Sequence, residues 1–471
     1  MLSRVIKEEL KRVVGEANAS FSKEDLLCYS YDATNTLYSP DAVVFPRTAE
    51  EISLIMKMAN AENFPVIPRG AGTGFTGGSV PVAGGVVLSF ERMTDIVEID
   101  AENLTAIVEP GVNTWELGQE AAKSGLFYPP DPTSLKFSTI GGNIAECAGG
   151  PSAVKYGVTR DYVLGLEAVL PTGEIINTGV RTVKGVVGYD LTKLLVGSEG
   201  TLAVITKAVL KLLPLPASSR TLLAVFPDLN GAASAVAGII RCRIIPSTLE
   251  LVDAVSARSA GEFSGGLPTG GPLLIIETDG SPETVGREAG EIERICLEKG
   301  AVEVRKASDK KEVKELWKAR RAISAALLKV RPNKINEDVV VPRSRIPELV
   351  TGIEEIAKRR GLLIASFGHA GDGNIHVNVM YDKKDEEESA EADGAVRDVF
   401  TLTLKLGGTI SGEHGVGITK SKYLAMELGP DAIRVMKGIK QTFDPKGILN
   451  PGKIFPDVMK KEKEDERTEF A

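Results

Sequence analysis

The sequence predicts an α+β fold made of two domains and a C-terminal segment, and three features support this prediction. Residues 1–215 are rich in short apolar strand patterns separated by glycine motifs. Pro-Leu-Pro at 214–216 then interrupts the pattern. From residue 216 to about 420, strand and helix patterns alternate, which is typical of an antiparallel sheet with helices on one face. Residues 421–471 remain as a C-terminal segment.

The composition excludes several classes of protein. The net charge is −8, and no run of Lys or Arg is interleaved with aromatic residues, so nucleic-acid binding is not expected. Cys28, Cys147, Cys242 and Cys296 form no CxxC pair, so neither an iron–sulfur cluster nor a disulfide framework is predicted. The N-terminal helix pattern contains acidic residues, unlike a signal peptide, and no apolar run could span a bilayer. We therefore expect a cytoplasmic protein that reaches a membrane only through a partner.

The elements of the first domain can be predicted in order. After the N-terminal helix, residues 38–70 predict a strand, a helix and a second strand. Thr48-Ala-Glu-Glu51 resembles a capping box, which would start that helix. Further strands are predicted where apolar residues are concentrated, at 84–90, 105–112, 164–176 and 200–214.

The second domain is predicted from the same two periodicities. Strands are expected at 221–227, 247–253, 272–280, 362–369 and 374–381, and helices at 230–242, 283–300, 312–330 and 343–360. The acidic stretch 382–394 predicts the solvated start of one more helix.

A glycine-rich loop follows the strand that ends near Ile67. Gly72–Gly77 satisfies the pattern GxGxxG, but a Rossmann site needs a helix immediately after the glycines. Pro81 and three more glycines follow instead, so no helix can start here. A nest of backbone N–H groups that binds phosphate is the functional interpretation. Considered alone, the loop could equally be an ordinary surface loop.

Two more clusters of small and hydroxyl residues occur in the same domain. One covers Ser138–Gly150 and is followed by Lys155-Tyr-Gly157; the other covers Lys184–Leu191 and Leu195–Leu202. Together the three clusters suit a long, bent ligand that is wrapped by backbone.

These clusters resemble the FAD domain of the vanillyl-alcohol oxidase/PCMH flavoprotein superfamily. The resemblance implies a PCMH-type FAD-binding domain in residues 1–215, with the pyrophosphate held by Arg69, Gly70, Ala71, Gly72, Thr73 and Gly74. It places Pro130, Asp131, Ser138, Thr139, Gly142, Asn143, Gly149, Tyr156 and Gly157 around the rest of FAD, and Ile205 near the adenine. Many relatives attach FAD to a histidine, but this chain has none before residue 369, so we expect non-covalent FAD. Cys147 could in principle form a cysteinyl link, but we interpret it as a small packed residue.

All three histidines of the chain fall in two short motifs. His369 and His376 belong to GHAGDGNIHVN, and His414 belongs to SGEHGVG. Asp-Gly between the first two is a strong hairpin signal, and a turn there would make these rings face each other. Glu413 could add a carboxylate, giving three ligands and an open position, as in catalytic metal sites. A lone histidine near a strand is normally a satisfied core residue, but this pairing favours a metal or catalytic site.

The two motifs together resemble the C-terminal domain of FAD-linked oxidases, a family that includes D-lactate dehydrogenase, D-2-hydroxyglutarate dehydrogenase and the glycolate oxidase flavoprotein subunit. The resemblance implies a divalent metal on His369, His376 and Glu413, with zinc first and manganese or iron as alternatives. It implies that His414 is the general base and that Asn378 lines the substrate site. Alternatively, His414 could only orient Glu413.

The same resemblance suggests how the substrate carboxylate is bound. Arg320 and Ser324 share one face of a predicted helix, and they match the family's carboxylate-binding arginine and a hydroxyl residue. Arg320 could equally be a surface charge. Lys334 is a further candidate. The segment 444–453 resembles the family's return to the flavin domain, with Asn450 and Lys453 as candidate flavin contacts.

The expected reaction is oxidation of a small D-2-hydroxy acid to the 2-oxo acid, with D-lactate first and glycolate or D-2-hydroxyglutarate as alternatives. A metal lowers the pKa of the hydroxyl, an imidazole accepts the proton, and the flavin accepts hydride. The chain has no cluster ligands, so an electron-transfer flavoprotein, an iron–sulfur subunit or a quinone would reoxidise it. A homodimer and a hetero-complex both stay open. The alternatives are a metal-free flavin oxidase and a non-catalytic flavoprotein subunit of an electron-transfer complex.

Overall fold

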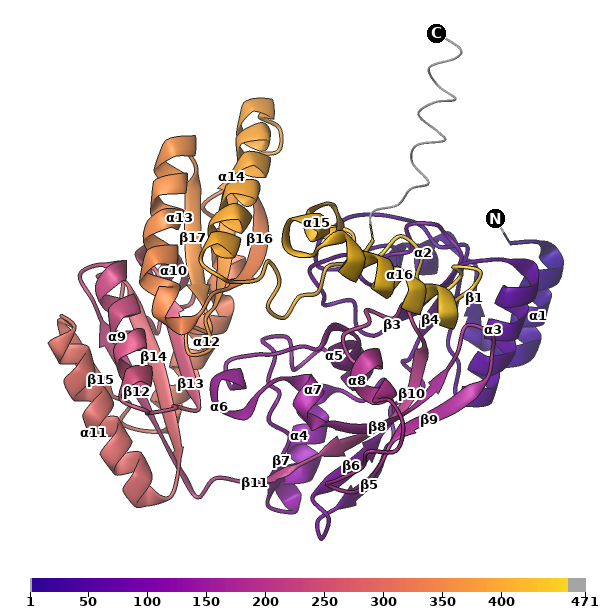
Figure 1. The fold of residues 1–471 in the computed structure, drawn as a ribbon, viewed down its shortest axis with the longest axis horizontal. Helices are drawn as coiled ribbons and strands as arrows, with labels where there is room; N and C mark the ends of the chain where they lie inside the picture. The colour runs from indigo at the N-terminus through magenta and orange to yellow at the C-terminus, as the bar shows by residue number, and fades with distance from the viewer. Residues whose placement is uncertain (1, 456–471) are drawn as a thin grey trace.

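The computed structural model describes residues 2–455. Its N-terminal half contains two larger sheets, and its C-terminal half contains a third, as Figure 1 shows from indigo to orange. The two halves lie side by side and are joined near Leu215, where the small strand β11 (Leu213–Pro214) ends.

The first sheet has four strands in the order β1-β2-β4-β3. The strands are β1 (Ala19–Ser20), β2 (Ala42–Val44), β3 (Val66–Arg69) and β4 (Val86–Ser89), of which the last three run parallel. Helices α1 (Arg4–Val14) and α3 (Ala49–Glu62) pack on it through Leu10 and Ile52. Thr48 Oγ1 accepts the Glu51 N–H at 3.2 Å, which confirms the predicted start of α3. The short elements η1 (Glu16–Asn18) and α2 (Lys23–Cys28) complete this region.

The second sheet is antiparallel, with five strands in the order β5-β6-β10-β8-β9. These are β5 (Ile96–Asp100), β6 (Thr105–Val108), β8 (Val163–Val169), β9 (Ile175–Gly179) and β10 (Val204–Lys211). A two-stranded pair joins β11 to β7 (Leu126–Phe127). The helices of this region are α4 (Thr114–Lys123), α5 (Ile140–Glu146), α6 (Ala153–Tyr156), α7 (Thr159–Tyr162) and α8 (Leu191–Leu195).

The third sheet is antiparallel throughout and has the strand order β15-β12-β14-β13-β17-β18-β16. Its strands are β12 (Ser218–Val225), β13 (Thr248–Val252), β14 (Leu273–Gly280), β15 (Glu303–Lys306), β16 (Asn333–Val340), β17 (Leu363–Gly368) and β18 (Asn374–Tyr381). The predicted hairpin is confirmed, because β17 and β18 pair with Phe367 opposite His376.

Helices cover both faces of this sheet, and not only the one face that the sequence predicted. One face carries α9 (Leu229–Arg241), α11 (Pro282–Glu298), α13 (Ile346–Arg360) and α14 (Glu386–Lys405). The other carries α10 (Ala254–Ser264) and α12 (Lys310–Leu327). The reason lies in the strands: neighbouring residues such as Leu222 and Leu223 are both buried, so both faces need an apolar cover.

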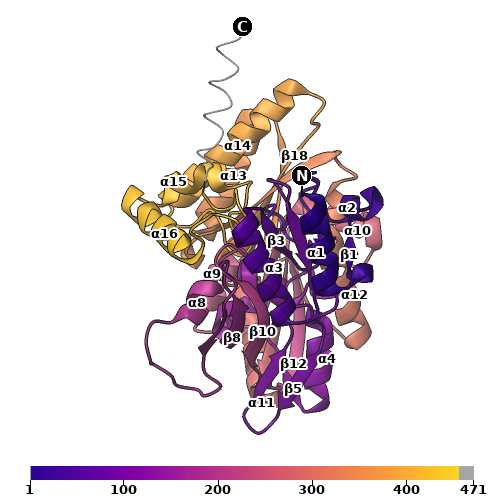
Figure 2. The same cartoon turned by 90° about the vertical axis from the view of Figure 1, so that its right-hand side faces the viewer.

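The C-terminal segment crosses back to the N-terminal half. After η3 (Ser421–Tyr423), helices α15 (Leu424–Glu427) and α16 (Pro430–Phe443) lie over that half (Figures 1 and 2). The short element η2 (Arg343–Arg345) lies earlier, directly before α13. Lys440 Nζ donates to the Thr201 carbonyl at 2.8 Å, and Leu449 forms a bridge with Val66. Residues 456–471 of this segment lie outside the described residues. Within residues 2–455, no helix is both long and apolar enough to cross a membrane.

Candidate active site

A cavity of about 660 Å³ lies between the two halves. Such a volume suits a bound cofactor or substrate. Its wall includes the six residues of the glycine-rich loop that we expected at the pyrophosphate, Arg69 to Gly74, and also Ser138, Thr139, Gly142, Asn143 and Ile205. The C-terminal half contributes Arg320, Arg321, Ser324, Asn336, Phe367, His376, Glu413 and His414. The cavity therefore brings most of the predicted cofactor residues next to the histidine motifs.

The glycine-rich loop runs from β3 to β4 without a helix, as the sequence predicted. Gly72 has a φ of +67°, which favours glycine, and a Cβ there would also displace the Arg69 guanidinium. Thr76 Oγ1, further along the loop, donates to the His414 carbonyl at 3.1 Å, and the Phe75 ring lies 5.2 Å from the His414 ring. The loop thus contacts the second histidine motif directly.

Seven residues that we expected around the cofactor do not line this cavity: Pro130, Asp131, Gly149, Tyr156, Gly157, Asn450 and Lys453. Several of them have hydrogen bonds elsewhere. The Tyr156 hydroxyl donates to Asp279 at 2.7 Å and so ties the two halves together. Asn450 Nδ2 donates to the Gly78 and Glu199 carbonyls, and Lys453 Nζ donates to the Val80 carbonyl at 2.5 Å. Neither Asn450 nor Lys453 lines the cavity.

Asp131 and Cys147 have structural contacts of their own. Asp131 accepts from Ser152 and borders a smaller cavity of about 200 Å³, which also touches Arg320. Cys147 packs against the core of the second sheet, in keeping with its interpretation as a small packed residue. In the third cluster, Ser198, Glu199 and Gly200 line the main cavity, whereas Val186, Val187 and Tyr189 are fully exposed.

The three predicted metal ligands converge. His369 Nε2 lies 3.4 Å from His376 Nε2 and 3.3 Å from Glu413 Oε1, and His376 Nε2 lies 3.5 Å from the same oxygen. Ligands bound tetrahedrally at about 2.0–2.1 Å from zinc are about 3.3 Å apart. The donor set therefore fits a tetrahedral cation with a fourth position open. Gly149 lies beside it, since a Cβ there would be 2.7 Å from Glu413 Oε2.

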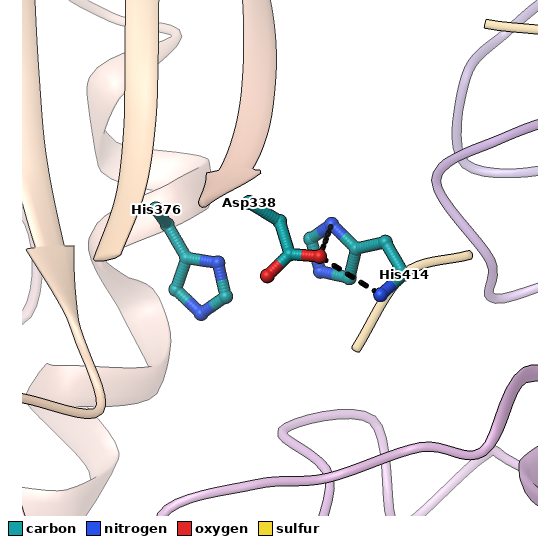
Figure 3. A group of neighbouring side chains, drawn as sticks. All are labelled: Asp338, His376 and His414. Atoms are coloured by element: carbon teal, nitrogen blue, oxygen red, sulfur yellow. Dashed lines mark hydrogen bonds and ion pairs between the residues drawn. The ribbon is translucent and has the colours of Figure 1, made fainter. Parts of the chain in front are cut away.

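Asp338, His376 and His414 form a second group with atoms close enough for a metal (Figure 3). Here the carboxylate already has other partners. Asp338 Oδ2 accepts the backbone N–H groups of Gly412, Glu413 and His414 at 2.9–3.0 Å. Its distance from His414 Nδ1 is 3.8 Å. Asp338 therefore anchors the turn that carries Glu413 and His414, and the first group is the better candidate metal site.

Electrostatics separates the roles of the histidines. Burial and the neighbouring charge of His369 lower the pKa of His376 to about 3, so His376 is neutral and able to bind a metal. Burial also lowers the pKa of His414, although Asp338 opposes this, so His414 is a neutral acceptor at pH 7. Burial alone would lower the pKa of His369, but Glu250 and Glu413 raise it well above its ordinary value.

Arg320 is buried, and its charge already has a partner. Its Nε donates to Glu250 Oε2 at 2.7 Å, and its guanidinium lies 4.7 Å above the Phe367 ring. The surface-charge alternative is therefore wrong, because the side chain is only 5% exposed. Arg320 nevertheless contributes to the cavity wall together with its exposed neighbour Arg321.

The other predicted substrate residues are divided. Ser324 lines the cavity, whereas Lys334 stands behind it and donates to the Ser324 carbonyl at 2.9 Å. Burial lowers the pKa of Lys334 to about 8. Asn378 is fully buried, is not part of the cavity wall, and donates to the Ala365 and His376 carbonyls. Its side chain supports the strand pair, and the structure does not bring it to the substrate position that we expected.

Comparison with known proteins agrees with this arrangement. A family model described as "FAD linked oxidases, C-terminal domain" matches residues 215–454, and one described as "FAD binding domain" matches residues 40–179. The chain is 47% identical to the glycolate oxidase subunit GlcD of Bacillus subtilis over 97% of each chain. The chain belongs to the FAD-linked oxidases.

Other FAD-linked oxidases are similar over nearly the whole length. The D-lactate dehydrogenase of Archaeoglobus fulgidus is 40% identical over 90% of this chain and 95% of its own. The D-lactate dehydrogenase of Anaerostipes hadrus is 37% identical over 94% of both. Among solved structures, p-cresol methylhydroxylase matches with a TM-score of 0.80 at 19% identity, over 97% of each chain, which shows the shared PCMH-type fold. The protein is thus an FAD-linked oxidoreductase with this two-domain fold.

Sequence analysis missed two carboxylates that organise the site of this FAD-linked oxidase. Glu250 contacts both His369 and Arg320, and Asp338 anchors the turn of Glu413 and His414. Glu250 lies between Leu249 and Leu251, and a charge in such an apolar strand is costly unless it is paired. That conflict was the available signal. Asp338, however, follows Glu337, so its strand gives no such contrast.

Proposed function

We propose that this protein oxidises a small D-2-hydroxy acid to the corresponding 2-oxo acid, with D-lactate first and glycolate or D-2-hydroxyglutarate as alternatives. The observation that carries the proposal is the convergence of His369, His376 and Glu413, of which His376 and Glu413 line the predicted FAD cavity. The names of the relatives, glycolate oxidase subunit and D-lactate dehydrogenase, support the same substrate class.

The chain's own groups would bind the cofactors and the substrate and would move the proton. His369, His376 and Glu413 would hold a divalent cation, zinc first, which would lower the pKa of a bound hydroxyl. Gly70, Gly72 and Thr73 on the cavity wall would hold FAD non-covalently, and FAD would supply the hydride acceptor. His414 accepts the hydroxyl proton, and the adjacent Asp338 carboxylate stabilises the resulting imidazolium. The remaining N–H groups of Arg320 attract the substrate carboxylate from the cavity wall.

The reduced flavin needs an external acceptor. The four cysteines are free and well separated in sequence, so they offer no cluster in the part of the chain that the structure describes. We infer that an electron-transfer flavoprotein, an iron–sulfur subunit or a quinone receives the electrons.

Anaerobic mixing tests the proposal. Purified, zinc-loaded protein is mixed with D-lactate, glycolate, D-2-hydroxyglutarate or L-lactate, and flavin absorbance near 450 nm is followed. We expect rapid bleaching with at least one of the first three and much slower bleaching with L-lactate. A flavin that none of these acids bleaches would refute the proposal and support a non-catalytic electron-transfer subunit.

Metal removal distinguishes the second alternative, a metal-free flavin oxidase. Dialysis against a chelator should abolish bleaching while FAD stays bound, and added zinc, manganese or iron should restore it. Full activity after complete metal removal would favour the metal-free oxidase.

A further inference from the structure

One buried carboxylate lies between the candidate metal site and the candidate substrate cation. Glu250, on β13, has no exposed surface. Its Oε1 lies 2.5 Å from His369 Nδ1, and its Oε2 accepts Arg320 Nε at 2.7 Å. A single side chain thus contacts a metal ligand with one oxygen and the carboxylate-binding arginine with the other.

The sheet itself fixes this position. Strands β13 and β17 pair with Leu251 opposite Gly368 and Val252 opposite Phe367. Continuing this register by one residue places Glu250 opposite His369. A carboxylate in the middle of a sheet is tolerated only when its charge is paired. The Arg320 guanidinium, itself only 5% exposed, provides that opposite charge for Glu250.

The contact with His369 determines which ring nitrogen is free. An ionised carboxylate only accepts, so Nδ1 must carry the hydrogen that it donates to Glu250. When His369 acts as a metal ligand, the ring has lost its second proton from Nε2, which lies 3.3 Å from Glu413 Oε1 and 3.4 Å from His376 Nε2. A carboxylate behind a ligating histidine fixes its tautomer and its ring orientation.

The contact with Arg320 fixes the orientation of the Arg320 guanidinium. Glu250 pairs with Nε and with Nη2, and the Phe367 ring lies 4.7 Å below the guanidinium. A planar guanidinium held at one edge and on one face cannot turn freely. Its other N–H groups remain available to the cavity that Arg320 lines.

We propose that Glu250 is a positioning residue that holds His369 for the metal and Arg320 for the substrate carboxylate at once. This inference rests on the proposed function only for the identity of the substrate. It predicts that loss of Glu250 weakens metal binding and carboxylate binding together, although Glu250 itself would contact neither the metal ion nor the substrate.

Two binding measurements on the FAD-loaded protein test the proposal. Zinc affinity is measured by competition with a chromophoric chelator. Affinity for oxalate, a carboxylate probe of substrate size, is measured from the flavin spectrum at zinc concentrations that saturate each variant. The test variant is Glu250→Gln. The matched control is Glu277→Gln, a largely buried glutamate on the adjacent strand β14, which contacts Thr221 and Trp317 but neither His369 nor Arg320.

We expect Glu250→Gln to bind zinc about 10- to 100-fold more weakly and oxalate about 10-fold more weakly. Glu277→Gln should stay within about threefold of wild type for both probes. Unchanged affinity for either probe in Glu250→Gln would overturn the proposal, since it requires both to fall.

An unpaired Arg320 could prevent Glu250→Gln from folding, and FAD content reports this. In that case the double variant Glu250→Gln/Arg320→Gln has no buried unpaired charge, and it is compared with Arg320→Gln. The double variant should bind zinc at least 10-fold more weakly than Arg320→Gln, and equal affinity would overturn the proposal. If the variants show these differences in affinity but no hydroxy acid bleaches the wild-type flavin, the proposed function fails while the role of Glu250 stands.

Discussion

Replacing Asp338 by asparagine should disable the site while leaving the fold and the flavin in place. Asp338 is fully buried, and its Oδ2 accepts the backbone N–H groups of Gly412, Glu413 and His414. Hydrogen bonds to a charged group contribute about 1.5–3 kcal/mol each, and neutral ones about 0.5–1.5 kcal/mol. Asparagine keeps the shape but loses the charge, so the three bonds weaken by about 1 kcal/mol each.

The turn that carries Glu413 and His414 would therefore lose about 3 kcal/mol of ordering free energy, and about 1.4 kcal/mol corresponds to a tenfold change in rate. We expect kcat/KM for the best hydroxy acid to fall about 100-fold. Steady-state kinetics with an artificial electron acceptor gives kcat/KM, and the ratio of flavin to protein absorbance gives FAD content.

The matched control is Asp253→Asn. Asp253 is also buried and also accepts backbone N–H groups, from Ser256 and Ser366, but it does not contact the turn. Its replacement should lower the melting temperature and leave kcat/KM within about threefold. If Asp338→Asn kept kcat/KM within twofold of wild type, the anchoring role of this carboxylate would be refuted.

Three further predictions concern the surroundings of the site. In Gly149→Ala the new Cβ would meet Glu413 Oε2 at 2.7 Å, so zinc affinity measured by chelator competition should fall about 10-fold with FAD retained; unchanged affinity would contradict the contact. Burial lowers the pKa of Lys334 from 10.5 to about 8, so the folded state binds this proton more weakly than the unfolded state. The free energy of unfolding should therefore rise between pH 8 and 10.5 by about 3 kcal/mol from this group. Urea melts should show that rise in wild type and a smaller one in Lys334→Met. An equal pH dependence of the unfolding free energy in the two proteins would contradict the prediction. Tyr156→Phe removes the hydrogen bond to Asp279 between the halves and should cost about 1 kcal/mol of unfolding free energy, read by calorimetry, with kcat unchanged.

The sequence was most informative where local chemistry decides the structure. Asp-Gly between the two histidines specified a hairpin, and the hairpin set His369 against His376. Pro81 excluded a helix after the glycine-rich loop, and no helix forms there. These outcomes depend on residues that are close in the chain, so a periodicity or a turn signal could predict them.

Contacts between distant residues could not be predicted in this way. Glu250 meets His369 only because β13 pairs with β17, more than 100 residues further along the chain. Tyr156 was expected at the cofactor, but its hydroxyl faces Asp279, because the second half packs against α6. The second helical layer on the large sheet likewise depends on packing between distant segments. The alternation of residues along a strand does not specify which helices cover each face of the sheet.

The turn of Glu413 and His414 is held from both halves of the molecule. From the large sheet, Asp338 accepts its N–H groups. From the N-terminal half, Glu199 accepts the N–H groups of Val416 at 2.8 Å and Gly417 at 2.6 Å. Thr76, in the glycine-rich loop, binds the His414 carbonyl. If they were fixed to one half alone, Glu413 and His414 would shift relative to the other half whenever the halves moved. Because three anchors from both sides meet on this turn, its position depends on the relative placement of the halves, and so does the geometry of the hydride transfer that we propose.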